Sequence, residues 1–141
     1  MKVFVSFDFD HDRQYKYTLD MWNGNDRIDF NYDDKSSSEI NSWNIDRIKA
    51  ALTMKIKQAD VVLVIVGSHA NSYHKDCRYI GNRNWQNWEI AKAKELGKKL
   101  VGVKLNHLNI SPDELLGSGA TWAMSFSKDA IVKALKNAFI S

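Results

Sequence analysis

The chain has 141 residues, of which 44% are hydrophobic and 26% charged, so it is long enough to bury the core of one soluble globular domain over residues 1–141. Its formal net charge of +3 is too small to indicate a nucleic-acid partner, and its longest apolar run, residues 61–66, is too short to cross a membrane. The only cysteine, Cys77, has no partner for an internal disulfide, which is typical of a cytoplasmic protein.

The first part of the chain is predicted to contain two strands separated by a helix. Residues 3–7 are β-branched and aromatic, which indicates a short strand. The next helix is expected to have Asp10 or Asp12 as its N-cap, because apolar residues then recur at helical spacing. Residues 28–32 alternate apolar and polar, which favours a half-exposed strand near a sheet edge.

The middle of the chain contains the clearest buried element. After a polar loop at residues 33–38, a helix is predicted from an apolar stripe that runs from Ile45 to Ile56. Residues 60–67 form an almost continuous β-branched run, which indicates a central parallel strand buried on both faces. Residues 68–84 are predicted to form a polar loop that is long enough for a functional role.

The alternation of strands and helices continues after this loop. A helix is predicted over residues 85–96, where Gly97 ends it. Residues 100–103 read as another buried strand. Ser111 and Pro112 are expected to be the N-cap and the first-turn residue of a short helix.

The chain is predicted to end with a strand and a helix. The strand covers residues 122–126, and Ser127 and Asp129 are expected to open the helix. The apolar face of this helix is expected to comprise Ile131, Leu135 and Phe139. Five strands that alternate with helices predict an α/β fold, a flavodoxin-like three-layer sandwich whose five-stranded parallel sheet has the order 2-1-3-4-5.

A ligand site is predicted where the strand order reverses, beyond the carboxyl ends of the first and third strands. The loop at residues 33–38 and the start of the helix at residue 85 are expected to converge on the same point. The residues that we expect to contact a ligand are Ser6, Phe7, Asp8, Asp34, Ser36, Gly67, His69 and Trp85.

Several common uses of this architecture are excluded by the residues present. A phosphorylatable receiver domain needs an aspartate at the end of its third strand, where Gly67 and its neighbours stand. Asp8 and Asp10 after the first strand would repel the phosphate of a flavin. The chain contains neither a G-x-G-x-x-G nor a Walker motif, which argues against Rossmann and P-loop nucleotide binding.

Trp85 and Glu89 are the strongest candidates for chemistry. Their spacing of four places an indole and a carboxylate on one face of the predicted helix, near its first turns. An aromatic ring can hold a nucleotide base, and a carboxylate can stabilise positive charge on a sugar. The alternative interpretation is that Glu89 is a solvated surface residue and Trp85 a packing residue, which are the commoner roles for these residue types.

No metal site is predicted. His74 and Cys77 have a short spacing that metal ligands often show, and His69 lies in the same loop. A fourth ligand is not evident, and no base is placed to activate Cys77 as a nucleophile. We therefore expect no metal and no permanently bound cofactor.

Four segments in this order resemble the TIR-like domains of the Thoeris ThsB type. They are residues 3–12, residues 59–67, Trp85-x-x-x-Glu89-Ile90, and residues 97–103. The resemblance implies cleavage of the N-glycosidic bond of NAD, often with formation of a cyclic ADP-ribose isomer, in bacterial antiphage defence. It also implies that Glu89 is the catalytic residue, since the family motif is a tryptophan followed four residues later by a glutamate.

The resemblance implies NAD as the substrate, a homo-oligomer, and a downstream effector reached through a nucleotide messenger. Two alternatives remain open. One is a non-catalytic TIR adaptor that assembles through exposed apolar surface and the loop at residues 33–38. The other is an enzyme similar to nucleoside deoxyribosyltransferases, with Glu89 as a covalent nucleophile.

Overall fold

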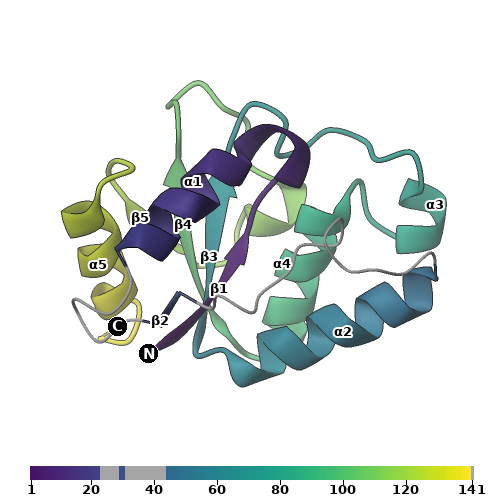
Figure 1. The fold of residues 1–141 in the computed structure, drawn as a ribbon, viewed down its shortest axis with the longest axis horizontal. Coiled ribbons are helices and arrows are strands. Elements are labelled where there is room, and N and C mark those ends of the chain that lie inside the picture. The colour runs from purple at the N-terminus through teal and green to yellow at the C-terminus, as the bar shows by residue number, and fades with distance from the viewer. Residues whose placement is uncertain (23–28, 31–43, 141) are drawn as a thin grey trace.

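The computed structural model describes residues 1–22, 29–30 and 44–140, and within them it shows one parallel sheet of order β2-β1-β3-β4-β5 (Figure 1). Every neighbouring pair of strands is parallel. The parallel α/β sheet predicted from the sequence is therefore confirmed. The strands are β1 (Lys2–Ser6), β2 (Asp29–Phe30), β3 (Val61–Val66), β4 (Lys99–Lys104) and β5 (Thr121–Ala123).

Helices cover both faces of the sheet. Figure 1 shows α1 and α5 on one side of the strands and α2 and α4 on the other, which makes three layers. No helix within the described residues is long and apolar enough to cross a membrane. The helices are α1 (Phe9–Met21), α2 (Ile45–Gln58), α3 (Cys77–Ile80), α4 (Trp85–Glu95), α5 (Lys128–Asn137) and the 3₁₀ helix η1 (Asp113–Leu115).

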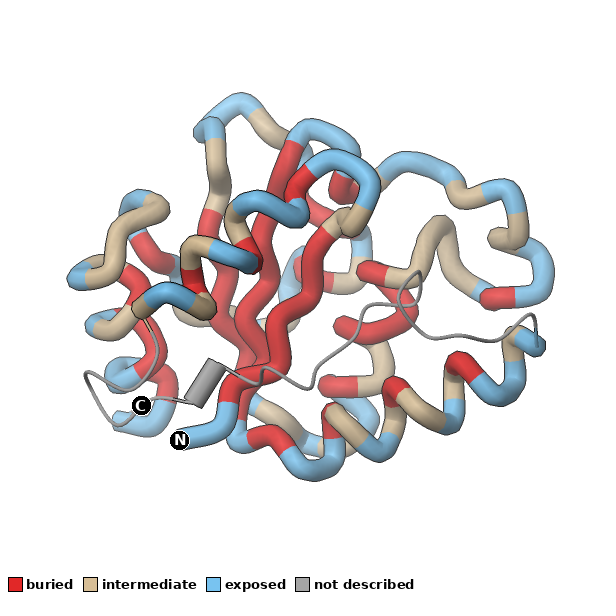
Figure 2. Tube along the Cα trace, viewed as in Figure 1, coloured by how far each residue is buried: buried red, intermediate tan, exposed pale blue. Residues whose placement is uncertain are grey.

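The sheet separates two apolar cores. All six residues of β3 are buried, and Figure 2 shows buried positions concentrated along the central strands. Because strand side chains alternate, Leu63 and its alternate neighbours pack with α1 and α5, whereas Val64 and its neighbours pack with α2 and α4. In α2 the apolar stripe predicted from the sequence is buried at Ile48, Leu52 and Ile56. Each core therefore joins one helical layer to the same sheet.

The N-terminus of α1 differs from the prediction. Asp8 is the N-cap, and its side chain accepts a hydrogen bond from the Asp10 amide at 3.1 Å. Helix α1 thus begins soon after β1, and Asp10 and Asp12 become residues of its first turn. The prediction that Asp10 or Asp12 caps this helix was wrong. Asp8, Asp10 and Asp12 offer equivalent capping groups, and the position at which β1 ends determines which of them is the N-cap.

Three other boundaries also differ from the sequence interpretation. The segment between β3 and α4 contains the one-turn helix α3, which was predicted as loop. The helix after β4 is a 3₁₀ turn with Pro112 at its N-cap and no side-chain cap, so Ser111 does not cap it. Strand β5 ends at Ala123, and Phe126 instead packs on one face of the sheet beside α1.

Helix α5 starts as predicted, since the Ser127 side chain accepts a hydrogen bond from the Ala130 amide at 3.3 Å. Ile131 and Leu135 are buried on its apolar face. Phe139 lies beyond the end of the helix and is 47% exposed, so its expected place on this face was wrong.

Candidate active site

A pocket lies beyond the carboxyl ends of β1 and β3, the point at which the strand order reverses. Its walls come from the start of α1, the segment between β3 and α4, and the first turns of α4. The lining residues are Phe7, Asp8, Phe9, Asp10, His11, His69, Ser72, Tyr73, His74, Asn84, Trp85, Gln86 and Glu89.

Glu89 is a buried carboxylate that lines this pocket. It lies in the second turn of α4 and is only 3% exposed. The hydroxyl group of Ser6, which is fully buried at the end of β1, donates a hydrogen bond to Glu89 Oε1 at 2.8 Å. Burying a carboxylate is unfavourable unless hydrogen bonds compensate for the lost hydration. The alternative that Glu89 is a solvated surface residue is therefore wrong for this structure.

Trp85 is the first residue of α4 and also lines the pocket. Its ring meets that of Trp88 edge to face, with 5.8 Å between ring centroids and an angle of 75°. Trp88 is 8% exposed and packs in the core with α2, so it holds the Trp85 ring from behind. The Trp85 ring is thus held by packing against Trp88 and also lines the pocket.

Asn84 connects the helix that carries Glu89 to the preceding loop. Its side-chain oxygen caps α4 by accepting from the Asn87 amide at 2.8 Å. Its amide group donates to the carbonyl oxygens of Ala70 at 2.9 Å and Ser72 at 2.8 Å. One side chain therefore fixes both the start of α4 and the loop beside it, which also lines the pocket.

The Gln86 side chain bridges β1 and β3 at the point where their pairing ends. The last paired residues of β1 and β3 are Ser6 and Val64. Beyond them, Gln86 Nε2 donates to the Ser6 carbonyl at 3.0 Å and to the Ile65 carbonyl at 2.8 Å. Gln86 is 4% exposed, and its Oε1 has no hydrogen-bond partner within the described residues. Its first role is to satisfy strand carbonyl groups that no neighbouring strand reaches.

Sequence analysis missed Gln86, although a signal for it was present. The first turns of α4 bury the polar side chains of Gln86, Asn87 and Glu89, and those of Gln86 and Glu89 form hydrogen bonds with strand residues. Polar residues at positions that the fold must bury usually serve hydrogen bonding or function. In the predicted three-layer sandwich this helix packs on the sheet, so a polar residue near its start is unexpected. That conflict could have indicated Gln86.

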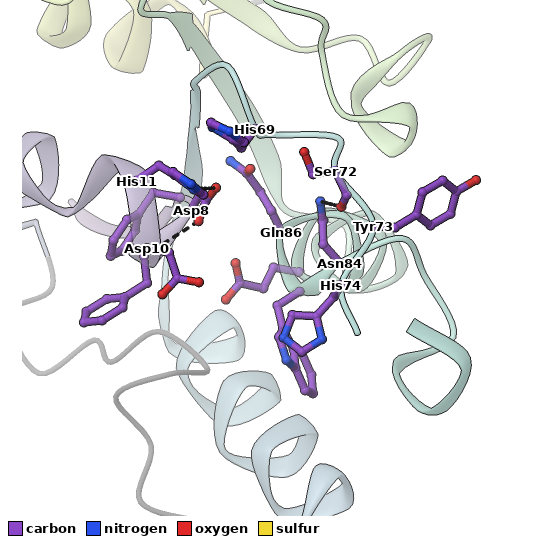
Figure 3. A pocket seen from close by; sticks show the side chains of 13 residues that line it. Asp8, Asp10, His11, His69, Ser72, Tyr73, His74, Asn84 and Gln86 are labelled. Atoms are coloured by element: carbon purple, nitrogen blue, oxygen red, sulfur yellow. Dashed lines mark hydrogen bonds and ion pairs between the residues drawn. The ribbon is translucent and has the colours of Figure 1, made fainter. Parts of the chain in front are cut away.

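Asp8, His11 and His69 lie together at one end of the pocket, and His74 lies at the other (Figure 3). The Asp8 carboxylate is 2.8 Å from His11 Nδ1, and this hydrogen bond is the main reason why the pKa of His11 is raised above its ordinary value. The rings of His11 and His69 stack with centroids 3.6 Å apart and an angle of 8°. This part of the pocket is therefore rich in imidazole and carboxylate groups.

Asp12 lies beside this group but is buried. It is 6% exposed, and its Oδ2 has no hydrogen-bond partner within the described residues. Burial raises the pKa of Asp12, and the nearby Asp8 carboxylate raises it further. The carboxylate lies against Gly67 at the end of β3, where any Cβ atom would overlap it. Gly67 thus makes room for Asp12.

The structure brings together most of the residues predicted to form the site. Phe7, Asp8, His69, Trp85 and Glu89 all line the pocket, and Ser6 supports Glu89 from behind. Gly67 is not among the lining residues, and Asp34 and Ser36 lie outside the described residues. The lining residues that the sequence analysis did not select are Phe9, Asp10, His11, Ser72, Tyr73, His74, Asn84 and Gln86.

Comparison with family models decides the family. Residues 4–110, well over half of the chain, match the model of the Thoeris protein ThsB, TIR-like domain. The chain belongs to the Thoeris ThsB TIR-like family. The matched span includes the second half of β1, the pocket residues and the Trp85–Glu89 pair of this ThsB-family domain. The search of curated proteins found no match.

Two solved structures share the fold of the ThsB-family domain. One is a 2-deoxyribosyltransferase from the psychrotolerant bacterium Bacillus psychrosaccharolyticus, with 14% identity, a TM-score of 0.56, and coverage of 89% of this chain and 88% of the other. The second is a prokaryotic SEFIR domain, with 19% identity, a TM-score of 0.52, and coverage of 96% and 88%. At these identities the likeness shows a common fold.

Proposed function

We propose that this ThsB-family domain cleaves the bond between ribose and nicotinamide in NAD, and that Glu89 is its catalytic residue. The observation that carries the proposal is the position of Glu89, a buried carboxylate that lines the pocket and is held by Ser6. A carboxylate in a partly enclosed pocket interacts more strongly with a developing positive charge than one in water.

The chemistry needs one carboxylate. When the bond between ribose C1′ and the pyridinium nitrogen breaks, the electron pair goes to nicotinamide, which leaves as a neutral molecule without a general acid. Positive charge develops on the ribose, and Glu89 stabilises this oxocarbenium-like transition state. Attack at C1′ by water gives ADP-ribose and releases a proton, whereas attack by a ring nitrogen of the adenine gives a cyclic ADP-ribose.

The other lining groups fit a cationic ring. Trp85 offers an aromatic face, which attracts the positive charge of nicotinamide. The carboxylates of Asp8 and Asp10 also line the pocket and favour positive charge there. NAD is in this proposal a substrate, and the domain holds no cofactor permanently.

The family indicates the biological setting. Membership of the Thoeris ThsB family supports a role in antiphage defence. In this setting the nucleotide product is a messenger for a downstream effector, and the domain works in the cytoplasm as a homo-oligomer. Asp34 and Ser36, which lie outside the described residues, remain proposed ligand contacts.

The test is release of nicotinamide from NAD by the purified protein, measured by chromatography at low and high protein concentration, with mass spectrometry of the nucleotide product. Glu89→Gln should lower the rate by ~100-fold or more, because it removes the charge that stabilises the transition state. The amide oxygen of glutamine can still accept from Ser6, so the circular dichroism spectrum should not change.

Glu95→Gln is the matched control, since Glu95 lies on the same helix, is exposed, and pairs with Lys92 at 2.8 Å. Its nicotinamide release should equal that of the native protein. Equal rates for native and Glu89→Gln would reject Glu89 as the catalytic residue. Self-assembly that survives Glu89→Ala, with no turnover at any concentration, would support the adaptor instead.

A second candidate activity is base exchange on 2′-deoxynucleosides, which the structural likeness to a 2-deoxyribosyltransferase favours. In that reaction the Glu89 carboxylate would attack C1′, expel the base, and hold the deoxyribosyl group until a second base takes it. Intact-protein mass spectrometry distinguishes the two activities. A deoxyribosyl adduct that is absent from Glu89→Ala would favour base exchange, and nicotinamide release from NAD without an adduct would favour the first proposal.

A further inference from the structure

His74 lines the pocket from the loop that runs beside the start of α4. Its main-chain amide donates to the Arg83 carbonyl at 2.6 Å, so the loop is attached two residues before Trp85. The Asn84 side chain holds the same loop by donating to one of its carbonyl groups at 2.8 Å. The position of His74 is therefore fixed relative to Trp85.

The hydrogen bond at Nδ1 fixes the tautomer of the neutral His74 ring. The main-chain amide of Asp76 lies 2.9 Å from this nitrogen. An amide N–H can only donate, so Nδ1 accepts with its lone pair and the proton of the neutral ring is on Nε2. The Asp76 carboxylate is 4.0 Å from Nδ1, which is too far for a hydrogen bond. His74 thus has an N–H donor at Nε2.

Nε2 is the ring nitrogen that remains for a ligand. The two nitrogens of an imidazole lie at different edges of the ring, and Nδ1 faces Asp76, which does not line the pocket. Figure 3 shows the labelled His74 ring facing the space between the lining side chains. The side chain is 33% exposed, so a ligand in the pocket can reach its outer edge.

The other two histidines of the pocket do not offer such a donor. His11 Nδ1 lies 2.8 Å from the Asp8 carboxylate, so Nδ1 carries the proton and Nε2 of the neutral ring is an acceptor. His69 Nδ1 lies 3.0 Å from the Ser68 hydroxyl, which can donate or accept, so neither tautomer is fixed. Among the histidines that line the pocket, His74 alone is therefore a fixed N–H donor when neutral.

We propose that His74 Nε2 donates a hydrogen bond to the carboxamide oxygen of nicotinamide and thereby makes the site specific for this leaving group. The proposal rests on the proposed function, in which Trp85 receives the nicotinamide ring. The carboxamide is attached at C3 of that ring and not at the nitrogen that leaves, so the hydrogen bond is present before and during cleavage. His74 is therefore a specificity residue, and it transfers no proton.

The test compares NAD with its thionicotinamide analogue, in which sulfur replaces the carboxamide oxygen and accepts hydrogen bonds more weakly. The ratio of kcat/KM between the two dinucleotides is measured in the native protein and in His74→Ala. The preference for NAD should fall by about tenfold in the variant, through KM, because one hydrogen bond to the oxygen is lost. Both proteins receive the same two substrates, so their intrinsic difference in leaving ability cancels.

His74→Gln and His107→Ala are the matched controls. The terminal nitrogen of glutamine lies about as far from the main chain as Nε2 of histidine, so His74→Gln should keep most of the preference for NAD. His107 is exposed and does not line the pocket, so its loss should leave the preference unchanged. Equal preferences in the native protein and His74→Ala would overturn the proposal, and so would a His74→Gln variant that discriminates no better than His74→Ala.

Free nicotinamide tests the contact without turnover. Its dissociation constant, from titration followed by NMR, should rise by about tenfold in His74→Ala, with little change for thionicotinamide. Binding that depends on His74, without cleavage of NAD, would reject the proposed function and keep the contact. Cleavage that depends on Glu89, with native affinity for nicotinamide in His74→Ala, would reject the contact alone. Absence of nicotinamide binding to the native protein would also overturn it.

Proton–nitrogen correlation spectra of the imidazole rings check the tautomer directly. In mildly alkaline buffer, where the ring is neutral, His74 should show a protonated Nε2 and an unprotonated Nδ1. The reverse tautomer would remove the donor and overturn the proposal.

Discussion

The hydrogen bond between Ser6 and Glu89 is the contact that gives the candidate site its geometry. Ser6 is fully buried and its position is set by the pairing of β1 with β3. Because Ser6 belongs to a strand paired in the sheet and Glu89 to a helix, the carboxylate is held more precisely than a loop would hold it before substrate arrives. Ser6 is therefore a positioning residue for Glu89.

We expect Ser6→Ala to lower kcat for nicotinamide release by about tenfold, since the loss of a hydrogen bond to a charged group corresponds to ~1.4 kcal/mol of transition-state stabilisation. KM should change little, because Ser6 does not line the pocket. Steady-state kinetics of both parameters provide the measurement. Ser118→Ala is the control, since Ser118 bonds to the Leu115 carbonyl at 2.7 Å outside the pocket. A raised KM with unchanged kcat would contradict the positioning role.

Gly67 and Asp12 form a second dependent pair. A methyl group at residue 67 would overlap the buried Asp12 carboxylate. We expect Gly67→Ala to lower the free energy of unfolding by about 1–3 kcal/mol, as overpacking of a buried site does. Urea denaturation measures it. In an Asp12→Ala background the same change should cost much less, because the overlap is removed. Equal costs in both backgrounds would show that Gly67 has another role.

Among the elements, α4 carries both Trp85 and Glu89 of the pocket. Its N-cap, Asn84, also holds the loop through two carbonyl groups. Loss of this one side chain therefore affects both the helix and the loop that precedes it. A cap that served the helix alone would lack this link.

We expect Asn84→Ala to lower the free energy of unfolding by about 2 kcal/mol, from the lost cap and the two unsatisfied carbonyl groups. Hydrogen exchange should become faster in residues 70–74, where the loop loses its attachment. Ser127→Ala is matched to it, because Ser127 caps α5 without contacting the loop before α4. That variant should lose about 1 kcal/mol and keep native exchange in residues 70–74. Unchanged exchange in Asn84→Ala would contradict the link.

The sequence predicts the elements best where a single physical signal dominates. The apolar run of β3 has one interpretation, a buried central strand. The alternating aspartates before α1 have several equivalent interpretations, so the wrong cap was chosen. Glu89 and Trp85 could be selected because their spacing along one helix matches the motif of the family that the sequence resembles. The stacking of His11 on His69 joins α1 to a distant loop, and no local pattern encodes such a contact.

Taken as a whole, the molecule consists of two cores that share one sheet. Trp22 packs against the core of α1 and α5, whereas Trp88 belongs to the core of α2 and α4. Neither helical layer has another surface on which to bury its apolar face. The two helical layers should therefore be stable only when both are packed on the sheet, as the prediction of a single domain requires.

We expect one cooperative unfolding transition, with coincident midpoints for tryptophan fluorescence and far-ultraviolet circular dichroism. Leu52→Ala, in one core only, should lower the free energy of unfolding by about 2–5 kcal/mol and keep the two midpoints together. Separate midpoints for the two probes would show two independently folding units.

The contact between Ser6 and Glu89 joins residues that are 83 positions apart in the sequence. During synthesis β1 leaves the ribosome long before α4, which carries the Glu89 carboxylate. The pocket can form only when both elements have packed together. The proposed cleavage of NAD would thus wait until α4 has been made and has met β1, so chains too short to contain Glu89 would leave NAD intact.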